Sequence, residues 1–155
     1  MPHFELPDEK TRELFAASYR RCTQNCSFMQ RFYDIFVGSS PAIAAKFEHT
    51  DMRHQARMVQ VSLVMLLAAV EGRDEGLQHL ERIAKIHGRA QHDIPAAMYE
   101  SWLDCLLQAV REYDPYCQEQ VEQAWRTILA PGIEYLKAHY DQPVTDARQI
   151  VRPAV

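Results

Sequence analysis

The stretch "IAKIHGRAQHDIP", residues 83–95, ends one helical pattern and leads into the next. Ile83, Ala84 and His87 continue the spacing set by Leu80, which places His87 on the apolar face of its helix. A buried imidazole needs a polar partner, because its desolvation otherwise costs free energy. Taken alone, such a residue is more often a core histidine with a hydrogen-bond partner than a metal ligand. Other residues of the chain are needed to distinguish these two roles.

Outside this stretch, hydrophobic residues recur at helical spacing along nearly the whole chain, and no segment alternates convincingly as a strand would. The spacing predicts a short helical turn from Pro41 to Phe47. It also predicts six main helices, at about residues 7–22, 29–37, 51–70, 74–87, 95–110 and 115–140. The predicted fold class is all-α.

Capping residues and glycines set the expected helix boundaries. Thr50 or Asp51 can cap the long helix that Gly72 ends, and Gly88 stops the helix that carries His87. Asp114 is the expected cap of the last helix, with Pro115 in its first turn.

The C-terminal part carries two further expectations. Pro131 should interrupt and kink the last helix, because it lacks an N–H donor. Residues 1–140 are expected to form one domain, since a chain of 155 residues suits a single core. Residues 141–155 are polar and are expected to be a flexible tail.

Composition narrows the class of protein. The chain has 47% hydrophobic and 25% charged residues and a formal net charge of −4, which is typical of a soluble globular protein and argues against nucleic acid or an anionic membrane as its main partner. Its longest apolar run, "VSLVMLLAAV" at residues 61–70, is too short to span a bilayer. The N-terminus lacks the apolar core of a signal peptide, and we expect four reduced cysteines in a cytoplasmic protein.

Three polar residues occupy faces that are otherwise apolar: Tyr33, Gln55 and His87. Each alone has an ordinary structural explanation. Together they are a poor zinc site, because too few ligands converge, but they suit haem, which needs one axial ligand and a pocket with hydrogen-bond donors. The candidate lining of such a pocket is apolar and aromatic: Phe47, Val59, Leu63, Ile94, Tyr99 and Trp102. The sequence has no phosphate-binding loop, nucleophile elbow or pair of adjacent carboxylates that would favour another chemistry.

At this point the chain resembles the globin family over about residues 8–140, especially bacterial single-domain globins and the globin domain of flavohaemoglobins. "FYDIF" followed by Pro41 and Phe47 is similar to the second helix, the short third helix and the haem-packing phenylalanine of globins. Tyr33 lies eight residues before Pro41, and Gln55 lies thirty-two before His87. Both spacings are those of the distal tyrosine, distal glutamine and proximal histidine of flavohaemoglobins.

The proximal segment departs from this pattern in two ways. The spacing from His87 to Ile94 is about two residues longer than in flavohaemoglobins, which leaves His92 as an alternative ligand. The glutamate that would join Tyr99 and His87 in the flavohaemoglobin relay aligns near Gln142, so the chain lacks it.

The resemblance implies a globin fold that encloses b-type haem, with His87 as the iron ligand and Tyr33 and Gln55 on the distal side. We expect the δ nitrogen of His87 to donate to a carbonyl one turn back, such as that of Ile83. The implied function is reversible binding of O2, with NO and CO as further gas ligands.

Two other functions stay open. One is an NO dioxygenase, or a related haem enzyme, that takes electrons from a separate reductase. The other is a haem-free helical signalling module. The aromatic and leucine-rich faces of the last two helices are candidates for a homodimer contact.

Overall fold

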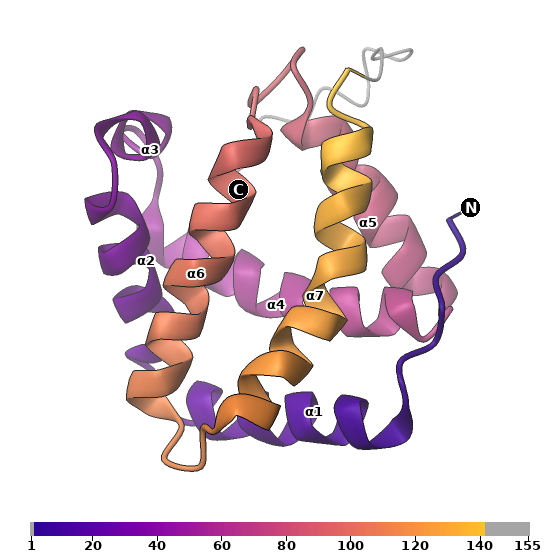
Figure 1. Ribbon diagram of the computed structural model, residues 1–155. Coiled ribbons are helices and arrows are strands. Elements are labelled where there is room, and N and C mark those ends of the chain that lie inside the picture. Colours follow the sequence, from indigo (N-terminus) through magenta and orange to yellow (C-terminus); the bar gives the residue numbers. More distant parts are fainter. Residues whose placement is uncertain (1, 142–155) are drawn as a thin grey trace.

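Helix boundaries in the computed structural model fall mostly where the capping residues predict them (Figure 1). The structure describes residues 2–141. Within that range it contains seven helices and no strand: α1 (Glu9–Thr23), α2 (Phe28–Gly38), α3 (Pro41–Lys46), α4 (Met52–Val70), α5 (Asp74–His87), α6 (Ala96–Tyr113) and α7 (Glu119–Ala138). The predicted all-α class is confirmed. The predicted tail, apart from Asp141, lies outside the described residues.

Local signals explain most of these boundaries. The Asp51 carboxylate accepts hydrogen bonds from the backbone N–H groups of Arg53 and His54 and so caps α4. Gly72, with φ of 75°, turns the chain after α4 in a conformation that favours glycine. α5 ends at His87, with Gly88 as the predicted stop.

The start and the continuity of α7 were predicted wrongly. α7 begins at Glu119, four residues after Pro115, and it runs through Pro131 without a break. Its buried face packs against α1 and α4, and this packing outweighs the one backbone hydrogen bond that proline removes.

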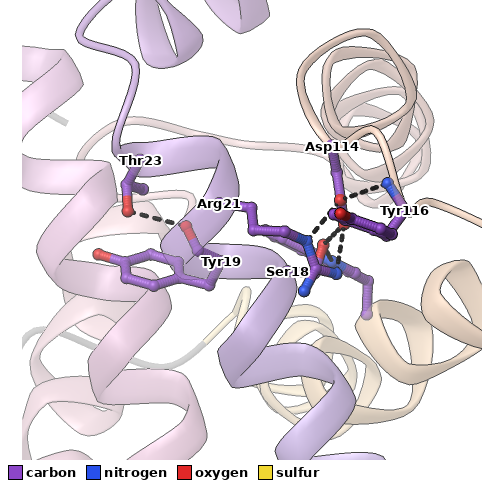
Figure 2. A network of polar contacts seen from close by, with 7 residues as sticks. Ser18, Tyr19, Arg21, Thr23, Asp114 and Tyr116 are labelled. Carbon is purple, nitrogen blue, oxygen red and sulfur yellow. Dashed lines mark hydrogen bonds and ion pairs between the residues drawn. The ribbon is translucent and has the colours of Figure 1, made fainter.

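Asp114 does not cap α7, which begins at Glu119; its carboxylate binds partners from α1 (Figure 2). The buried carboxylate accepts a hydrogen bond of 2.6 Å from the Ser18 hydroxyl and bonds of 2.6 and 2.9 Å from the Arg21 guanidinium. It also accepts from the backbone N–H of Tyr116, while the Trp125 indole donates to Ser18. Burial alone would raise the pKa of Asp114, but these donors outweigh it and lower the pKa. The network therefore ties α1 to the turn between α6 and α7.

The helices pack in crossed pairs around one core. α6 and α7 stand side by side in Figure 1, with α4 crossing behind them and α1 crossing below. The most extensive contacts join α4 with α5, α2 with α6 and α1 with α7. The apolar residues of α6 and α7 are used inside this core, and the large hydrophobic side chains that are exposed lie elsewhere within residues 2–141: Leu6, Val61, Val64 and Tyr116. The homodimer through α6 and α7 therefore remains a prediction, and no large exposed hydrophobic side chain on the described part of these helices supports it.

Gly76 fixes the closest approach of α4 and α5. A Cβ atom at this position would lie 2.3 Å from the backbone nitrogen of Ala69 and 2.7 Å from the carbonyl oxygen of Met65. These are backbone atoms of α4, so a larger residue can be accommodated only if the two helices separate.

We therefore expect Gly76→Ala to lower the free energy of unfolding by about 1–3 kcal/mol, as overpacking does in a close-packed interior. Urea denaturation followed by circular dichroism measures this change. Gly38→Ala is the matched control: nothing lies within 4 Å of a Cβ there, so this helical substitution should leave stability unchanged or raise it. Equal stabilities of the two variants would contradict the assigned contact.

Candidate functional site

Six helices and the segment between α5 and α6 line a partly open cleft with a cavity volume of about 100 Å³. All nine residues that the sequence singled out line this cleft: Tyr33, Phe47, Gln55, Val59, Leu63, His87, Ile94, Tyr99 and Trp102. The fold therefore brings together residues that are up to 69 positions apart in the chain.

One wall carries His87, the last residue of α5. Its Nδ1 lies 3.2 Å from the Tyr99 hydroxyl, and Nε2 has no hydrogen-bond partner among the described residues. The expected partner of Nδ1, the carbonyl of Ile83, is wrong, because the first turn of α6 places Tyr99 against the imidazole instead. Burial, together with the nearby His92, lowers the pKa of His87 to about 3, so the imidazole is neutral at pH 7.

Another wall carries Tyr33 on α2 and Gln55 on α4, which are 4% and 1% exposed. The Gln55 amide nitrogen donates a hydrogen bond of 3.0 Å to the Tyr33 hydroxyl oxygen. The Tyr33 ring packs edge-on against Phe47, with 5.7 Å between ring centroids. Burial raises the pKa of Tyr33, although the Gln55 contact opposes this, so the phenol keeps its proton.

This pair leaves polar atoms uncommitted. Because Tyr33 accepts from Gln55, its own O–H has no acceptor in the described part of the chain, and the buried Oε1 of Gln55 has no partner either. Reversing the amide would pair Tyr33 with Oε1 but would leave the amide nitrogen unpaired instead. In both orientations the wall keeps hydrogen-bonding capacity that the protein itself does not use, which is unusual for buried polar atoms.

The segment after His87 is bonded to α3, whose Lys46 lines the cleft. Lys46 at the end of α3 donates hydrogen bonds of 2.9 and 2.8 Å to the carbonyls of His92 and Asp93. The His92 ring lies 6.2 Å from that of His87 but does not line the cleft, and its Nε2 is buried without a partner. The geometry thus presents His87, rather than His92, to the cleft.

Comparison with known proteins gives one informative match. No family model matches the sequence, and no curated protein does. A crystal structure from Pseudomonas aeruginosa, described as structurally highly homologous to a human haemoglobin, matches with a TM-score of 0.81 and 34% sequence identity. The match covers 85% of this chain and 99% of that one. The chain belongs to the same family as this protein. Its fold is globin-like.

Several residues that line the cleft of this globin-like chain were not singled out from the sequence. Most are apolar and continue helix faces already assigned to the core: Phe36, Leu66, Ile83, Met98, Ile133 and Leu136. Lys46 gave no signal, because it is a charged residue beside Phe47. Ser62 did give one, since it lies seven residues after Gln55 on the same face of α4.

The described residues offer no competing metal site. Among them, no group of three or more histidine, cysteine, aspartate or glutamate side chains could hold a metal ion. All four cysteines are free thiols. Within residues 2–141, none of the helices combines the length and the hydrophobicity that crossing a membrane requires.

Behind the cleft wall, His79 on α5 joins α4 to α5. Its Nε2 lies 3.0 Å from the Ser62 hydroxyl, and its Nδ1 lies 2.7 Å from an Arg82 nitrogen. Burial, reinforced by the positive charge of Arg82, lowers the pKa of His79 from 6.5 to about 4.

The unfolded chain binds a proton at His79 below about pH 6.5, whereas the folded chain does so only near pH 4. The full stability is therefore present above pH 6.5 and is lost as the pH falls toward 4. We expect His79 to lower the free energy of unfolding by about 1–2 kcal/mol over this pH range. This is less than the full pKa shift implies, because Arg82 is exposed and can move away from a protonated His79. Urea denaturation at pH 7 and pH 4.5 should show a smaller pH dependence for His79→Gln than for the wild type. An identical dependence would contradict this assignment.

Proposed function

We propose that the protein is a haem-binding globin that holds b-type haem through His87 and reversibly binds O2, and also NO and CO. The observation that carries this proposal is the cleft itself: its one uncommitted imidazole nitrogen and an uncommitted tyrosine O–H stand in an otherwise largely apolar enclosure. The Pseudomonas relative described as homologous to a human haemoglobin supports the same conclusion.

His87 has the features expected of the residue that would hold the haem iron. Its neutral imidazole can give the Nε2 lone pair to iron, while Nδ1–H donates to the Tyr99 hydroxyl oxygen. A hydrogen bond on the outer nitrogen fixes the tautomer and the orientation of a ligating histidine. Phe47, Val59, Leu63, Ile94 and Trp102 would supply the apolar lining of a haem pocket. Non-covalent haem is expected, because the sequence has no C-x-x-C-H attachment motif.

When bound, haem iron with one protein ligand supplies an open position for a diatomic gas. Tyr33 can direct its O–H toward a ligand there, and Gln55 holds the phenol in place through the 3.0 Å hydrogen bond. When haem is bound, the donors of Tyr33 and Gln55 would favour O2 over the less polar CO. Strong donation of this kind slows O2 release and suits sensing, scavenging or chemistry on O2 better than rapid delivery.

A specific contact favours a second candidate function, NO dioxygenation. The Tyr99 hydroxyl at Nδ1 of His87 makes the imidazole a more basic ligand, which would support chemistry on O2. Conversion of NO and O2 to nitrate also needs one electron per turnover, which a separate reductase would supply. Consumption of NO under air with a chemical reductant would distinguish this enzyme from a protein that only binds gases.

The decisive experiment is a titration of the purified haem-free protein with haem. We expect one equivalent to saturate the protein and to give the absorption spectrum of a histidine-ligated haem, which changes on reduction and on addition of CO. Failure to bind haem would refute the proposal and leave the haem-free signalling module.

A further inference from the structure

Arg82, His79 and Ser62 form a hydrogen-bond chain with a fixed direction. A guanidinium can only donate, so Nδ1 of His79 must accept the 2.7 Å hydrogen bond from Arg82. A neutral imidazole then carries its proton on Nε2 and donates it across 3.0 Å to the Ser62 hydroxyl oxygen. The chain therefore runs from the exposed Arg82 to a residue of the cleft wall.

This direction leaves the proton of Ser62 without an acceptor. Because His79 donates to the hydroxyl, Ser62 cannot donate back to that ring. A helical serine often bonds to the carbonyl four residues earlier, here Met58, but Ser62 has no hydrogen bond besides the one to His79 within the described residues. The same direction excludes a serine nucleophile, since His79 is a donor to Ser62 and not its base. Ser62 thus presents a free O–H in a stretch of the cleft wall that Val59, Leu63 and Leu66 make apolar.

Ser62 lies too far from Gln55 to serve the same ligand atom. Seven residues separate them on α4, which is about 10 Å along the helix axis. Whatever fills the cleft must therefore meet two separate polar positions, one at Tyr33 and Gln55 and one at Ser62.

We propose that Ser62 is a hydrogen-bond donor available to a carbonyl substituent on the periphery of the tetrapyrrole in the cleft. The cleft then prefers an iron porphyrin with a carbonyl substituent on that edge to one with only hydrocarbon there. This inference rests on the proposed haem-binding function. Ser62 is then a residue that determines cofactor specificity. His79 and Arg82 are positioning residues, because their hydrogen bonds leave the Ser62 O–H free to donate into the cleft.

Two iron porphyrins of similar shape test the inference: iron protoporphyrin IX, and its analogue with acetyl groups in place of the two vinyl groups. Affinities are measured by absorption titration of the haem-free protein. One neutral hydrogen bond corresponds to about a fivefold change in affinity. We expect Ser62→Ala to weaken binding of the acetyl porphyrin, relative to protoporphyrin, by about that factor. The infrared stretch of the hydrogen-bonded acetyl carbonyl should move to higher frequency in the same variant.

The positioning role and the control use three more variants. His79→Gln can accept from Arg82 through its oxygen and donate to Ser62 through its nitrogen, so it should keep the preference, whereas His79→Leu should lose it. Ser39→Ala is the control, because its hydroxyl donates to the Phe36 carbonyl and does not line the cleft. An unchanged affinity ratio in Ser62→Ala would overturn the inference while leaving the proposed function intact. Failure of the wild type to bind either porphyrin would overturn both.

Discussion

Replacing His87 with alanine is expected to weaken haem binding by at least about a hundredfold. The substitution removes the imidazole that faces the cleft. Loss of only the hydrogen-bond partner of a metal-binding histidine typically lowers metal affinity ten- to a hundredfold, so loss of the histidine itself should cost at least as much. The rate of haem transfer to an excess of an apo-globin acceptor measures the loss. Imidazole added to the His87→Ala protein should restore part of the spectrum of the histidine-ligated form, because the small ligand can enter the vacated space.

His92→Ala is the matched control for this experiment. His92 lies in the segment after α5, its ring is 6.2 Å from that of His87, and it does not line the cleft. We expect this variant to retain haem with a nearly unchanged spectrum. If His92→Ala loses haem while His87→Ala keeps it, the ligand assignment is wrong and the segment rearranges when haem binds.

The second large effect is expected for Tyr33→Phe, which should speed O2 dissociation by roughly ten- to a hundredfold. A hydrogen bond to a charged or strongly polarised group contributes about 1.5–3 kcal/mol, which corresponds to this range. The ring of Tyr33 is buried against Phe47, and phenylalanine keeps that contact, so no large cavity complicates the result. Stopped-flow displacement of O2 by CO measures the dissociation rate.

CO release is the internal control, since CO is a weaker hydrogen-bond acceptor and its dissociation should change much less. Gln55→Leu should act in the same direction as Tyr33→Phe but with a smaller effect, because Gln55 holds the phenol through a single hydrogen bond. An unchanged O2 release rate in Tyr33→Phe would mean that Tyr33 is only a core residue.

Local sequence was sufficient for most of the helices. The Asp51 cap, the turn at Gly72 and the stop at Gly88 depend on residues within a few positions of each other, and the structure has α4 and α5 where these signals place them. The sequence also placed Tyr33, Gln55 and His87 on buried faces, because a helix repeats every 3.6 residues and its apolar stripe must face the core.

The choice of partner for each polar side chain required the tertiary structure. Asp114 has the local signature of a helix cap, but its carboxylate accepts from Ser18, 96 residues earlier in the chain, and the last helix begins only at Glu119. His87 has a helical carbonyl within reach by sequence, yet Tyr99 of the next helix takes its Nδ1.

The set of helices and the faces that they bury can therefore be predicted from the sequence alone, because both follow from backbone geometry and the spacing of apolar residues over short distances. The crossing of α4 and α5 at Gly76, and the direction of the hydrogen bonds from Arg82 through His79 to Ser62, were decided only in the folded chain. Side chains from different helices can bind the same polar atom. Which of them does so depends on their distance in the folded chain, and that distance cannot be predicted from neighbouring residues in the sequence.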